Sequence, residues 1–468
     1  MRKASAAPAA SGERQRSRDG GPLPAAKRLW QLQEAPDPVV EAYTTGEDPA
    51  LDSALLRYEA LGTLAHARGL ERIGILSRKE CLSLRNCFRT LLRREGFTIL
   101  PSQEDIHTAV EQHLTAKLGE LGRKVHAGRS RNDQVQTDIR LMLKDRLLSI
   151  HAAAVSAARR WARFGERHRK ALMPGYTHLQ RAMPTTVGHW AASHAEALIE
   201  GCRGLRWAFE EADACPLGSA AGFGVTLPLD RAFVARLLGF SRIQRNTLRV
   251  QTSRPRLEAA ALSALALLAR DLGTLSWDIC LFSTAEFGFM SLDSAFTTGS
   301  SIMPQKRNPD VAELTRARAA LFPGWLSQAL SLGQLPSGYH RDYQMTKGPL
   351  LRALGTMGEM LEIVGRIPAA LTVRPERCRA AVTEDMLAAQ RAMELVRSGV
   401  PFREAYQRIA AQSRKLGEPK TARAPVLPKF PGSPGNPGWA AMERDAARER
   451  SWAALRRAAL DKAWNRLL

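Results

Sequence analysis

Two long stretches of the chain, residues 187–211 and 257–279, place apolar residues three or four positions apart with charged residues between them. This spacing lines up one apolar stripe along a helix, so it predicts two long amphipathic helices. The sequence lacks alternating runs long enough to build a sheet, and aromatic residues, which favour strands, make up only 6%. The sequence therefore predicts a mainly α protein.

The length of 468 residues exceeds what a single core usually supports, so several units are expected. We expect a disordered basic tail over 1–28, an N-terminal helical domain over 29–128, a central long-helix bundle domain over 129–366, a small C-terminal helical domain over 367–416, and a Pro/Gly-rich linker with a basic tail over 417–468. Within the last part, Trp439, Trp452 and Trp464 lie on an Ala/Arg-rich frame that indicates a helix.

The net charge of +22 is concentrated at both ends of the chain and is elsewhere spread without a dense basic block. No interleaving of aromatic and basic residues accompanies it, which argues against specific binding of nucleic acid. A basic protein also suits a substrate that carries several carboxylates.

The six cysteines show no spacing typical of a disulfide framework or a metal site, so they indicate reduced thiols in a cytoplasmic protein. The N-terminus has no apolar region of the kind that a secretory signal requires. The most apolar stretch, 259–269, ends at Arg270 and is too short to cross a bilayer. We expect a soluble protein that binds no membrane.

The segment Gly299–Pro309, GSSIMPQKRNP, brings two hydroxyls, an ammonium group and an amide into one loop. Its glycine lets the backbone bend, while Pro304 and Pro309 discourage a helix, and helical spacing resumes only afterwards. Such groups together can gather an anion. The residues concerned are Ser300, Ser301, Lys306 and Asn308.

A second polar segment, His126–Gln134, contains GRSRND. Asn132 or Asp133 can cap a helix that starts near Val135, with backbone N–H groups pointing outward. Arginine binds carboxylates through two parallel hydrogen bonds, so a carboxylate cradle is predicted here. Its members are Arg129, Ser130, Arg131 and Asn132.

His178 follows the turn-forming residues Pro174 and Gly175 and precedes a helical run, so we expect it near the start of a helix. The positive end of a helix disfavours the imidazolium form, which keeps the ring near neutrality, where it can take and return protons. Without such a setting, a single histidine is more often a structural hydrogen-bonding group.

Several of these segments resemble one known family. GSSIMPQKRNP is similar to the signature of the fumarase/aspartase/argininosuccinate lyase superfamily, while GRSRNDQV and PGYTHLQ resemble its argininosuccinate lyase branch. Two more segments agree, because Glu104–His107 is similar to the family's ED-x-H and Tyr339–Lys347 to its Y-x-R-D-x-Q-x-x-K. The resemblance covers residues 29–410.

The chain departs from this family at several places. Ala127 stands where threonine is usual, and Ser253 replaces the acidic neighbour of the arginine matched by Arg254. The usual WGGRF opening is absent after Trp30, and residues 46–52, GEDPALD, replace a shorter Ser-containing turn. The N-terminal substrate contacts are therefore where the chain differs most from the family.

The resemblance implies an elimination that removes a proton beside a carboxylate, breaks a C–N bond to arginine and releases fumarate. It assigns the base to Ser300, and it makes Glu313 the acid that orients His178 for proton transfer on the leaving-nitrogen side. We expect Lys306 and Asn308 to stabilise the negative charge that develops. By the resemblance, substrate-binding roles fall on His107, Arg129, Ser130, Arg131, Asn132, Thr177, Arg254, Ser301, Tyr339, Gln344 and Lys347.

The fold implied by the resemblance has three helical domains, whose long central helices form the twenty-helix core of a homotetramer with active sites shared between subunits. No cofactor or metal is implied, and no GxGxxG, P-loop or zinc-binding pattern occurs in the sequence. Two alternatives stay open. One is another fumarate-releasing lyase, of the adenylosuccinate lyase or aspartate ammonia-lyase type, and the other is a non-catalytic relative like the eye-lens crystallins of this family.

Overall fold

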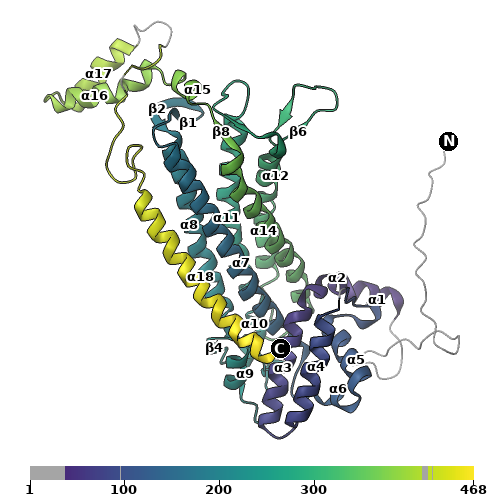
Figure 1. Cartoon of the computed structure of the whole chain (residues 1–468). Coiled ribbons are helices and arrows are strands. Elements are labelled where there is room, and N and C mark those ends of the chain that lie inside the picture. Colours follow the sequence, from purple (N-terminus) through teal and green to yellow (C-terminus); the bar gives the residue numbers. More distant parts are fainter. Residues whose placement is uncertain (1–36, 95, 414–419, 424) are drawn as a thin grey trace, which may run out of the picture.

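A computed structural model of the chain describes residues 37–94, 96–413, 420–423 and 425–468. The expected tail over 1–28 and the departure after Trp30 lie outside these residues. The described residues are mainly helical, and long helices run side by side through the centre of the molecule (Figure 1). This confirms a mainly α fold with a central bundle. The five-part division of the chain stays a prediction.

Four long helices form the bundle, namely α7 (Arg131–Arg167), α8 (Val187–Ala212), α11 (Arg254–Phe282) and α14 (Lys347–Ala370). Ser130 caps α7, because its Oγ accepts a hydrogen bond from the N–H of Asn132 and its own N–H donates to Asp133. The expectation that Asn132 or Asp133 caps a helix starting near Val135 was therefore wrong. A serine with an acid three residues later satisfies two terminal N–H groups reciprocally, so the helix starts earlier.

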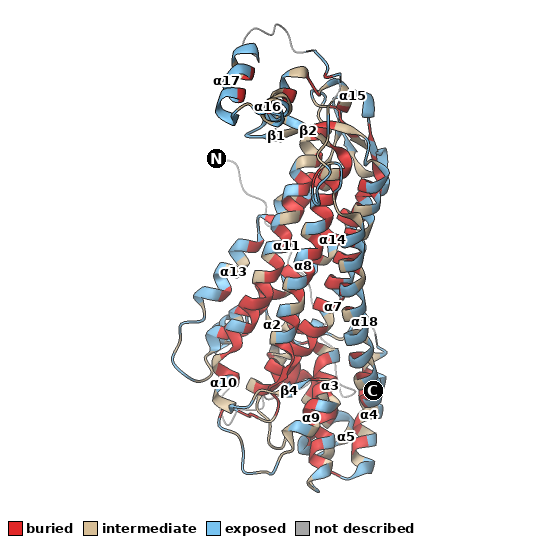
Figure 2. Ribbon diagram, turned by 90° about the vertical axis from the view of Figure 1, so that its left-hand side faces the viewer, coloured by how far each residue is buried: buried red, intermediate tan, exposed pale blue. Residues whose placement is uncertain are grey.

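The faces of these helices that meet inside the bundle are buried, and the outward faces are exposed (Figure 2). On α11, for example, Leu265 and Leu268 are fully buried, whereas Leu267 is 63% exposed. By length and composition, α11 could also cross a membrane. However, 67% of its most apolar 18-residue stretch is buried against the rest of the protein. A core helix of a globular protein passes the same test.

The N-terminal elements lie at one end of the bundle (Figure 1). They are α1 (Pro38–Thr45), α2 (Asp48–Asp52), η1 (Ser53–Leu55), α3 (Leu56–Arg72), α4 (Arg78–Leu92), η2 (Pro101–Gln103), α5 (Ile106–Leu118) and α6 (Glu120–Lys124). The same end holds α9 (Arg231–Leu237), α10 (Thr247–Thr252), η4 (Arg341–Thr346) and the parallel strands β3 (Ala214–Cys215) and β4 (Arg242–Ile243). Both α11 and α14 begin here.

Short strands and helices occupy the opposite end (Figure 1). Three antiparallel pairs lie there, β1 (Leu172–Thr177) with β2 (Gln180–Thr186), β5 (Met290–Leu292) with β8 (Leu371–Val373), and β6 (Thr298–Gly299) with β7 (Arg307–Asn308). The remaining elements are η3 (Ser294–Phe296), α12 (Asp310–Ala319), α13 (Phe322–Ser331), α15 (Pro375–Ala380), η5 (Glu384–Leu387), α16 (Ala388–Arg397) and α17 (Phe402–Ser413). Of these, α12 and α13 run back along α11.

The last helix, α18 (Trp439–Leu467), lies along α7 and α8 (Figure 1). Trp464 is 1% exposed, and its indole N–H donates to the main-chain oxygen of Leu238 at 3.1 Å. About a third of the way along the helix, the carboxylate of Glu449 contacts the buried ring of His151 at 3.1 Å. The helix that the tryptophans indicated is thus an integral part of the bundle rather than a free tail.

Candidate active site

A pocket of about 170 Å³ lies where the N-terminal helices meet the first turns of α7, α11 and α14. It brings together several predicted substrate-binding residues from segments far apart in the sequence. These residues are His107, Arg131, Asn132, Arg254, Tyr339, Gln344 and Lys347. The pocket is also lined by Asp48, Asp52, Glu104, Asp105, Val135 and Arg341.

Lys347 is held at the pocket by two carboxylates from α2. Its Nζ lies 3.0 Å from the carboxylate of Asp48 and also contacts that of Asp52. Burial lowers the pKa of Lys347, but the charges of Asp52 and Asp48 outweigh this effect and raise the pKa above its usual value. The lysine is therefore a fixed cation in a nearly dry place, since it is only 2% exposed.

Glu104 holds two arginines of the pocket in the same way. Its carboxylate accepts from Arg131 at 3.0 Å and from Arg341 at 2.8 Å, and Asp105 accepts from Arg131 at 3.1 Å. Glu104 also has a φ of +69°, a left-handed backbone conformation that strains a residue other than glycine. These ion pairs fix both guanidinium groups before any ligand binds, which is the preorganisation that favours electrostatic catalysis.

Arg254 is the third fixed arginine. It is 1% exposed and donates from Nε to the carboxylate of Glu258 at 3.2 Å, and the hydroxyl of Thr346 donates to the same oxygen at 3.1 Å. Its Nη2 has no hydrogen-bond partner among the described residues. A buried guanidinium with an unused donor at the pocket wall suits the carboxylate of a ligand.

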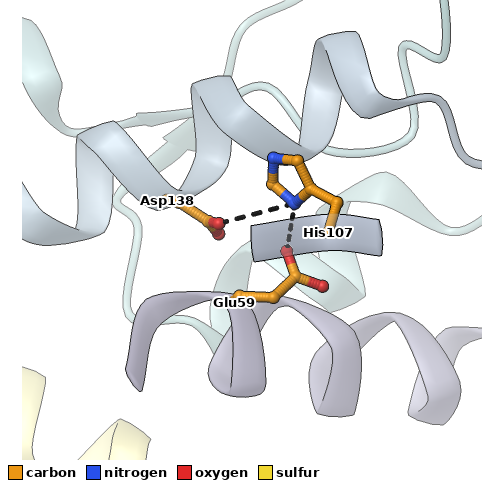
Figure 3. A group of neighbouring side chains, drawn as sticks. All are labelled: Glu59, His107 and Asp138. Atoms are coloured by element: carbon orange, nitrogen blue, oxygen red, sulfur yellow. Dashed lines mark hydrogen bonds and ion pairs between the residues drawn. The ribbon is translucent and has the colours of Figure 1, made fainter. Parts of the chain in front are cut away.

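Two buried acidic residues, Glu59 and Asp138, contact His107 on one side of its ring. Its Nδ1 donates to the carboxylate of Glu59 at 2.8 Å, and the carboxyl group of Asp138 lies 3.9 Å from the same nitrogen (Figure 3). All three side chains are at least 95% buried. The other ring nitrogen, Nε2, has no hydrogen-bond partner among the described residues, so its N–H is available to a ligand in the pocket.

The charges in this cluster follow from its burial and its contacts. Burial lowers the pKa of His107, but the charge and hydrogen bond of Glu59 outweigh this and raise it. Burial raises the pKa of Glu59, but His107 and then Arg129 outweigh this and lower it. For Asp138, burial and the charge of Glu59 both raise the pKa well above its usual value. These shifts favour an imidazolium beside the carboxylate of Glu59 and the neutral form of Asp138.

The same cluster is also a possible ligand set for a metal ion, because its ligand atoms lie within 4.8 Å of one another. The guanidinium of Arg129 already lies 3.8 Å from Glu59, and His107 carries a proton on the nitrogen that faces the acids. Arg129 and His107 thus already supply positive charge to the carboxylate of Glu59. The cluster fits a proton-bearing site better than a metal centre.

Arg129 and Ser130 do not line this pocket. The guanidinium of Arg129 is 4% exposed and donates to the hydroxyl of Thr63 at 2.7 Å, beside Glu59. Ser130 caps helix α7. In the described chain, both therefore support the neighbours of the pocket, and their contact with substrate stays a prediction.

His178 lies at the other end of the bundle, at the tip of the β1–β2 hairpin. The pairing of Thr177 with Gln180 leaves His178 and Leu179 as the two turn residues. Their φ angles are +55° and +59°, although a two-residue turn of this kind usually needs Asn or Gly. Strained residues of this sort often mark functional sites, and Leu179 is 76% exposed.

The expectation that His178 lies near a helix start was wrong. Helix α8 begins only at Val187, after strand β2 has ended. Strand β2 instead pairs with β1 as far as Thr186, so the hairpin occupies the residues between His178 and the helix.

The signature loop joins β6 to β7 and extends into solvent at the same end as His178 (Figure 1). The Oγ of Ser300 accepts hydrogen bonds from the N–H groups of Ile302 at 3.3 Å and Met303 at 3.1 Å. Hydrogen bonds of this kind favour a negatively charged oxygen over a neutral hydroxyl. Ser301 and Lys306 are exposed, and Asn308 is half-buried.

Glu313 follows this loop in α12, where its carboxylate lies 3.7 Å from Arg316. Within the described part of the chain, no hydrogen bond or ion pair joins His178, Ser300 and Glu313 to one another. The roles assigned to these three residues stay predictions.

The predicted site residues therefore form two groups at opposite ends of the bundle. Arg254 and Lys347 are the first residues of α11 and α14, whereas Ser300 follows the far end of α11 and His178 follows the far end of α7. At 1.5 Å per residue, α14 is about 36 Å long and α11 about 43 Å. One chain cannot bring both groups to one small molecule.

Sequence reasoning missed the acids that hold the pocket cations, as well as Arg341. Glu104, Asp105 and Arg341 lie inside segments that the family resemblance had already marked, so a signal existed for them. Asp48 and Asp52 are four residues apart on one face of a helix. Nothing in the sequence connects them to Lys347, which follows Asp48 by 299 positions.

Residues 32–324 match the family described as Lyase. With the helical bundle and the charged pocket, this match defines the protein as an enzyme of the lyase class. The chain is 44% identical to the argininosuccinate lyase of Sorangium cellulosum, over 87% of this chain and 96% of that enzyme. It is 41% identical to that of Stenotrophomonas maltophilia, over 91% and 99%. The chain belongs to the argininosuccinate lyase family.

Solved structures agree with this placement. A variant of EDDS lyase with bound fumarate has a TM-score of 0.78 and 26% identity, over 93% of this chain and 95% of that chain. EDDS lyase in complex with formate has a TM-score of 0.77 and 25% identity, with the same coverage. A class II fumarase from Schistosoma mansoni, with a TM-score of 0.66 and 15% identity over 79% of this chain and 91% of that chain, shares the fold alone.

Proposed function

We propose that the protein cleaves argininosuccinate reversibly to arginine and fumarate, a step of arginine biosynthesis. The observation that carries this proposal is an identity of 40–44% to argininosuccinate lyases along almost their whole length. The segments GRSRNDQV and PGYTHLQ support it as well, because they favour this branch over the adenylosuccinate and aspartate ammonia-lyases.

The pocket supplies the charges that one part of such a substrate needs. Argininosuccinate carries three carboxylates and a guanidinium group. Arg131, Arg254 and Lys347 are fixed cations for the carboxylates, and His107 adds an N–H donor from Nε2.

Ser300 acts as the base. Removal of a proton beside a carboxylate places a second negative charge on that carboxylate, which Lys306 and Asn308 stabilise. Each such donor contributes about 3 kcal/mol. The N–H groups that reach the Oγ of Ser300 favour its deprotonated form. Closure of the exposed loop over substrate surrounds it with positive charge and excludes water.

His178 transfers a proton on the side of the leaving nitrogen, directly or through water, and Glu313 orients its ring. Histidine suits this task because its two ring nitrogens can accept and donate a proton. The turn that carries His178 is exposed and has positive φ angles, so we infer that a second surface completes the site around this histidine.

The working enzyme is a homotetramer whose active sites draw residues from several subunits. One observation and one geometric argument support this. The pocket measures about 170 Å³, less than the roughly 300 Å³ that ligand sites usually reach, which fits a site that another surface completes. In addition, antiparallel packing of two bundles around a two-fold axis would bring the hairpin end of one copy to the pocket end of another.

The enzyme works in the cytoplasm on its small-molecule substrate, without a cofactor, a nucleic acid or a membrane. The six cysteines are unpaired in the structure, as suits a reducing compartment. Burial raises the pKa of Cys81 to about 11, which keeps this thiol unreactive.

The substrate is tested by following the release of fumarate through its ultraviolet absorbance. Argininosuccinate, adenylosuccinate and aspartate are supplied separately to the full chain. We expect turnover of argininosuccinate with a kcat/KM at least about 100-fold above the other two. Preference for either of the others contradicts the proposal, and a folded tetramer without turnover supports the crystallin-like alternative.

A further inference from the structure

A second cavity, of about 630 Å³, opens between the end of α8, strand β4, helix α10 and the start of α11. It shares no lining residue with the substrate pocket, although Ser253 lines one and Arg254 the other. Five arginines and one acid are among its lining residues. They are Arg140, Arg242, Arg245, Arg249, Arg256 and Glu211. We call this cavity the arginine pocket.

Arg140 is the most informative member, because it is 3% exposed and yet forms no ion pair with a carboxylate of the described residues. One guanidinium nitrogen donates to the side-chain oxygen of Gln244 at 2.7 Å, and Nε has no partner among the described residues. Burial lowers the pKa of Arg140 to about 10, against the more distant charge of Glu258. A buried charge without a counter-ion costs folding free energy, and a bound anion near this arginine would reduce that cost.

Two other arginines of the pocket donate hydrogen bonds to neutral oxygens rather than to carboxylates. Arg242 donates to the main-chain oxygens of Asp213 and Glu210. Among the described residues, the guanidinium of Arg249 makes only long contacts of 3.5 Å, to Thr252.

Of the five pocket arginines, only Arg256 forms an ion pair with an acid in the described part of the chain, with Glu211 at 3.5 Å, and both side chains are partly exposed. No hydrogen bond or ion pair links the guanidinium of Arg245 to the described residues. The arginine pocket thus has four more cations than anions.

We propose that the arginine pocket binds a compact polyanion that carries two or more negative charges on phosphate or carboxylate oxygens. Arginine matches such oxygens through paired N–H groups, and several guanidinium groups around one cavity require more than a single charge. The side chains of Gln244, Asn246 and Ser253 add neutral polar groups to the same wall. The cavity is large enough for a ligand, since binding sites usually measure about 300–1,000 Å³.

Calorimetric titration of the full chain tests this at an ionic strength of about 0.15 M, where long-range attraction is screened. Inorganic pyrophosphate and citrate serve as probes of the phosphate and carboxylate classes. The pocket variants are Arg140→Gln and the double variant Arg245→Gln/Arg249→Gln, whose positions are exposed. The control is Arg236→Gln, which removes a charge from the exposed face of α9 outside the pocket. Argininosuccinate cleavage without added anion reports whether each variant is folded.

We expect saturable binding of at least one probe, weakened about tenfold or more in both pocket variants and unchanged by Arg236→Gln. Tighter binding of pyrophosphate or of citrate identifies the chemical class. If Arg140→Gln does not fold, the exposed double variant decides. The proposal is overturned if neither probe binds, or if Arg236→Gln weakens binding as much as the pocket variants do.

Discussion

Arg254 and Ser300 lie at opposite ends of the bundle, because Arg254 is the first residue of α11 and Ser300 lies in the loop beyond its last turn. The helix between them is about 43 Å long. If both residues act on one small substrate, as proposed above, they must come from different copies of the chain. The separation of these two residues is therefore the structural reason to expect a shared active site.

Substitution of Ser300 tests the proposed base. Ser300→Ala should lower kcat by at least about 100-fold, because general-base catalysis typically contributes factors of 10² to 10⁴, while KM changes little. The neighbouring variant Ser301→Ala is the matched control, and it should raise KM more than it lowers kcat. Steady-state kinetics of fumarate release measure both. An unchanged kcat in Ser300→Ala would remove Ser300 from the mechanism.

Lys347 should be important for folding as well as for binding. Lys347→Met leaves Asp48 and Asp52 without their cation, and loss of one partner from a buried ion pair costs about 3–5 kcal/mol. Urea denaturation at fixed protein concentration should show this loss of unfolding free energy. Adding Asp52→Asn should restore part of it.

The exposed pair of Arg318 and Glu359 provides the comparison for the buried pair. Arg318→Met should change the free energy of unfolding by less than about 1 kcal/mol, because exposed ion pairs contribute little. Equal effects of the Lys347 and Arg318 variants would show that burial of the lysine has no energetic consequence.

The pair of Glu59 and His107 should make stability depend on pH in two directions. The raised pKa of His107 contributes stability that is complete below the unfolded value of 6.5 and is lost as pH rises through the folded value. The lowered pKa of Glu59 contributes stability that is present above the unfolded value of 4.5 and is lost as pH falls. The native protein should therefore be more stable than His107→Asn by the largest margin between about pH 4.5 and 6.5.

Thermal unfolding from about pH 4 to pH 9 measures this difference in Tm. His113→Asn, on the same helix, is the control, because burial lowers the pKa of His113 and the largest influences on it include no acid. A difference between the native protein and His107→Asn that stays constant over the whole range would contradict the buried ion pair.

Helix α18 should stabilise the bundle. Trp464→Ala removes a buried indole and its hydrogen bond, and it should cost about 3–5 kcal/mol of unfolding free energy. Leu455→Ala, on the same helix at a side chain that is 72% exposed, should change it by less than about 0.5 kcal/mol. If Trp464→Ala changed the free energy of unfolding as little as Leu455→Ala, helix α18 would not stabilise the bundle.

Local patterns were sufficient to predict the helical bundle. The spacing of apolar residues over 187–211 and 257–279 depends only on neighbouring turns, and α8 and α11 lie there. The same reasoning failed at His178, because the hairpin depends on the pairing of Thr177 with Gln180 across a strained turn. Turn residues with positive φ that are neither Asn nor Gly carry no clear sequence signal.

Some of the residues that line the pocket could not be predicted from the sequence, because they depend on tertiary contacts. His107, Arg131 and Lys347 were predicted from recognisable segments, and the structure places them in one pocket. The partners of Lys347 are set by how α2 packs on the start of α14, which is a tertiary contact. Likewise, the arginine pocket gathers residues from α7, β4, α10 and α11 that share no local pattern.

The most direct test of the shared active site mixes two inactive variants. Arg254→Gln damages the pocket end of the bundle, and Ser300→Ala damages the hairpin end. The two variants are co-expressed or unfolded and refolded together, and fumarate release is compared with that of each variant alone. Sites that combine an intact pocket from one copy with an intact loop from another should restore activity far above either parent. If the mixed assemblies stay as inactive as their parents, Arg254 and Ser300 do not act on the same substrate from different copies of the chain.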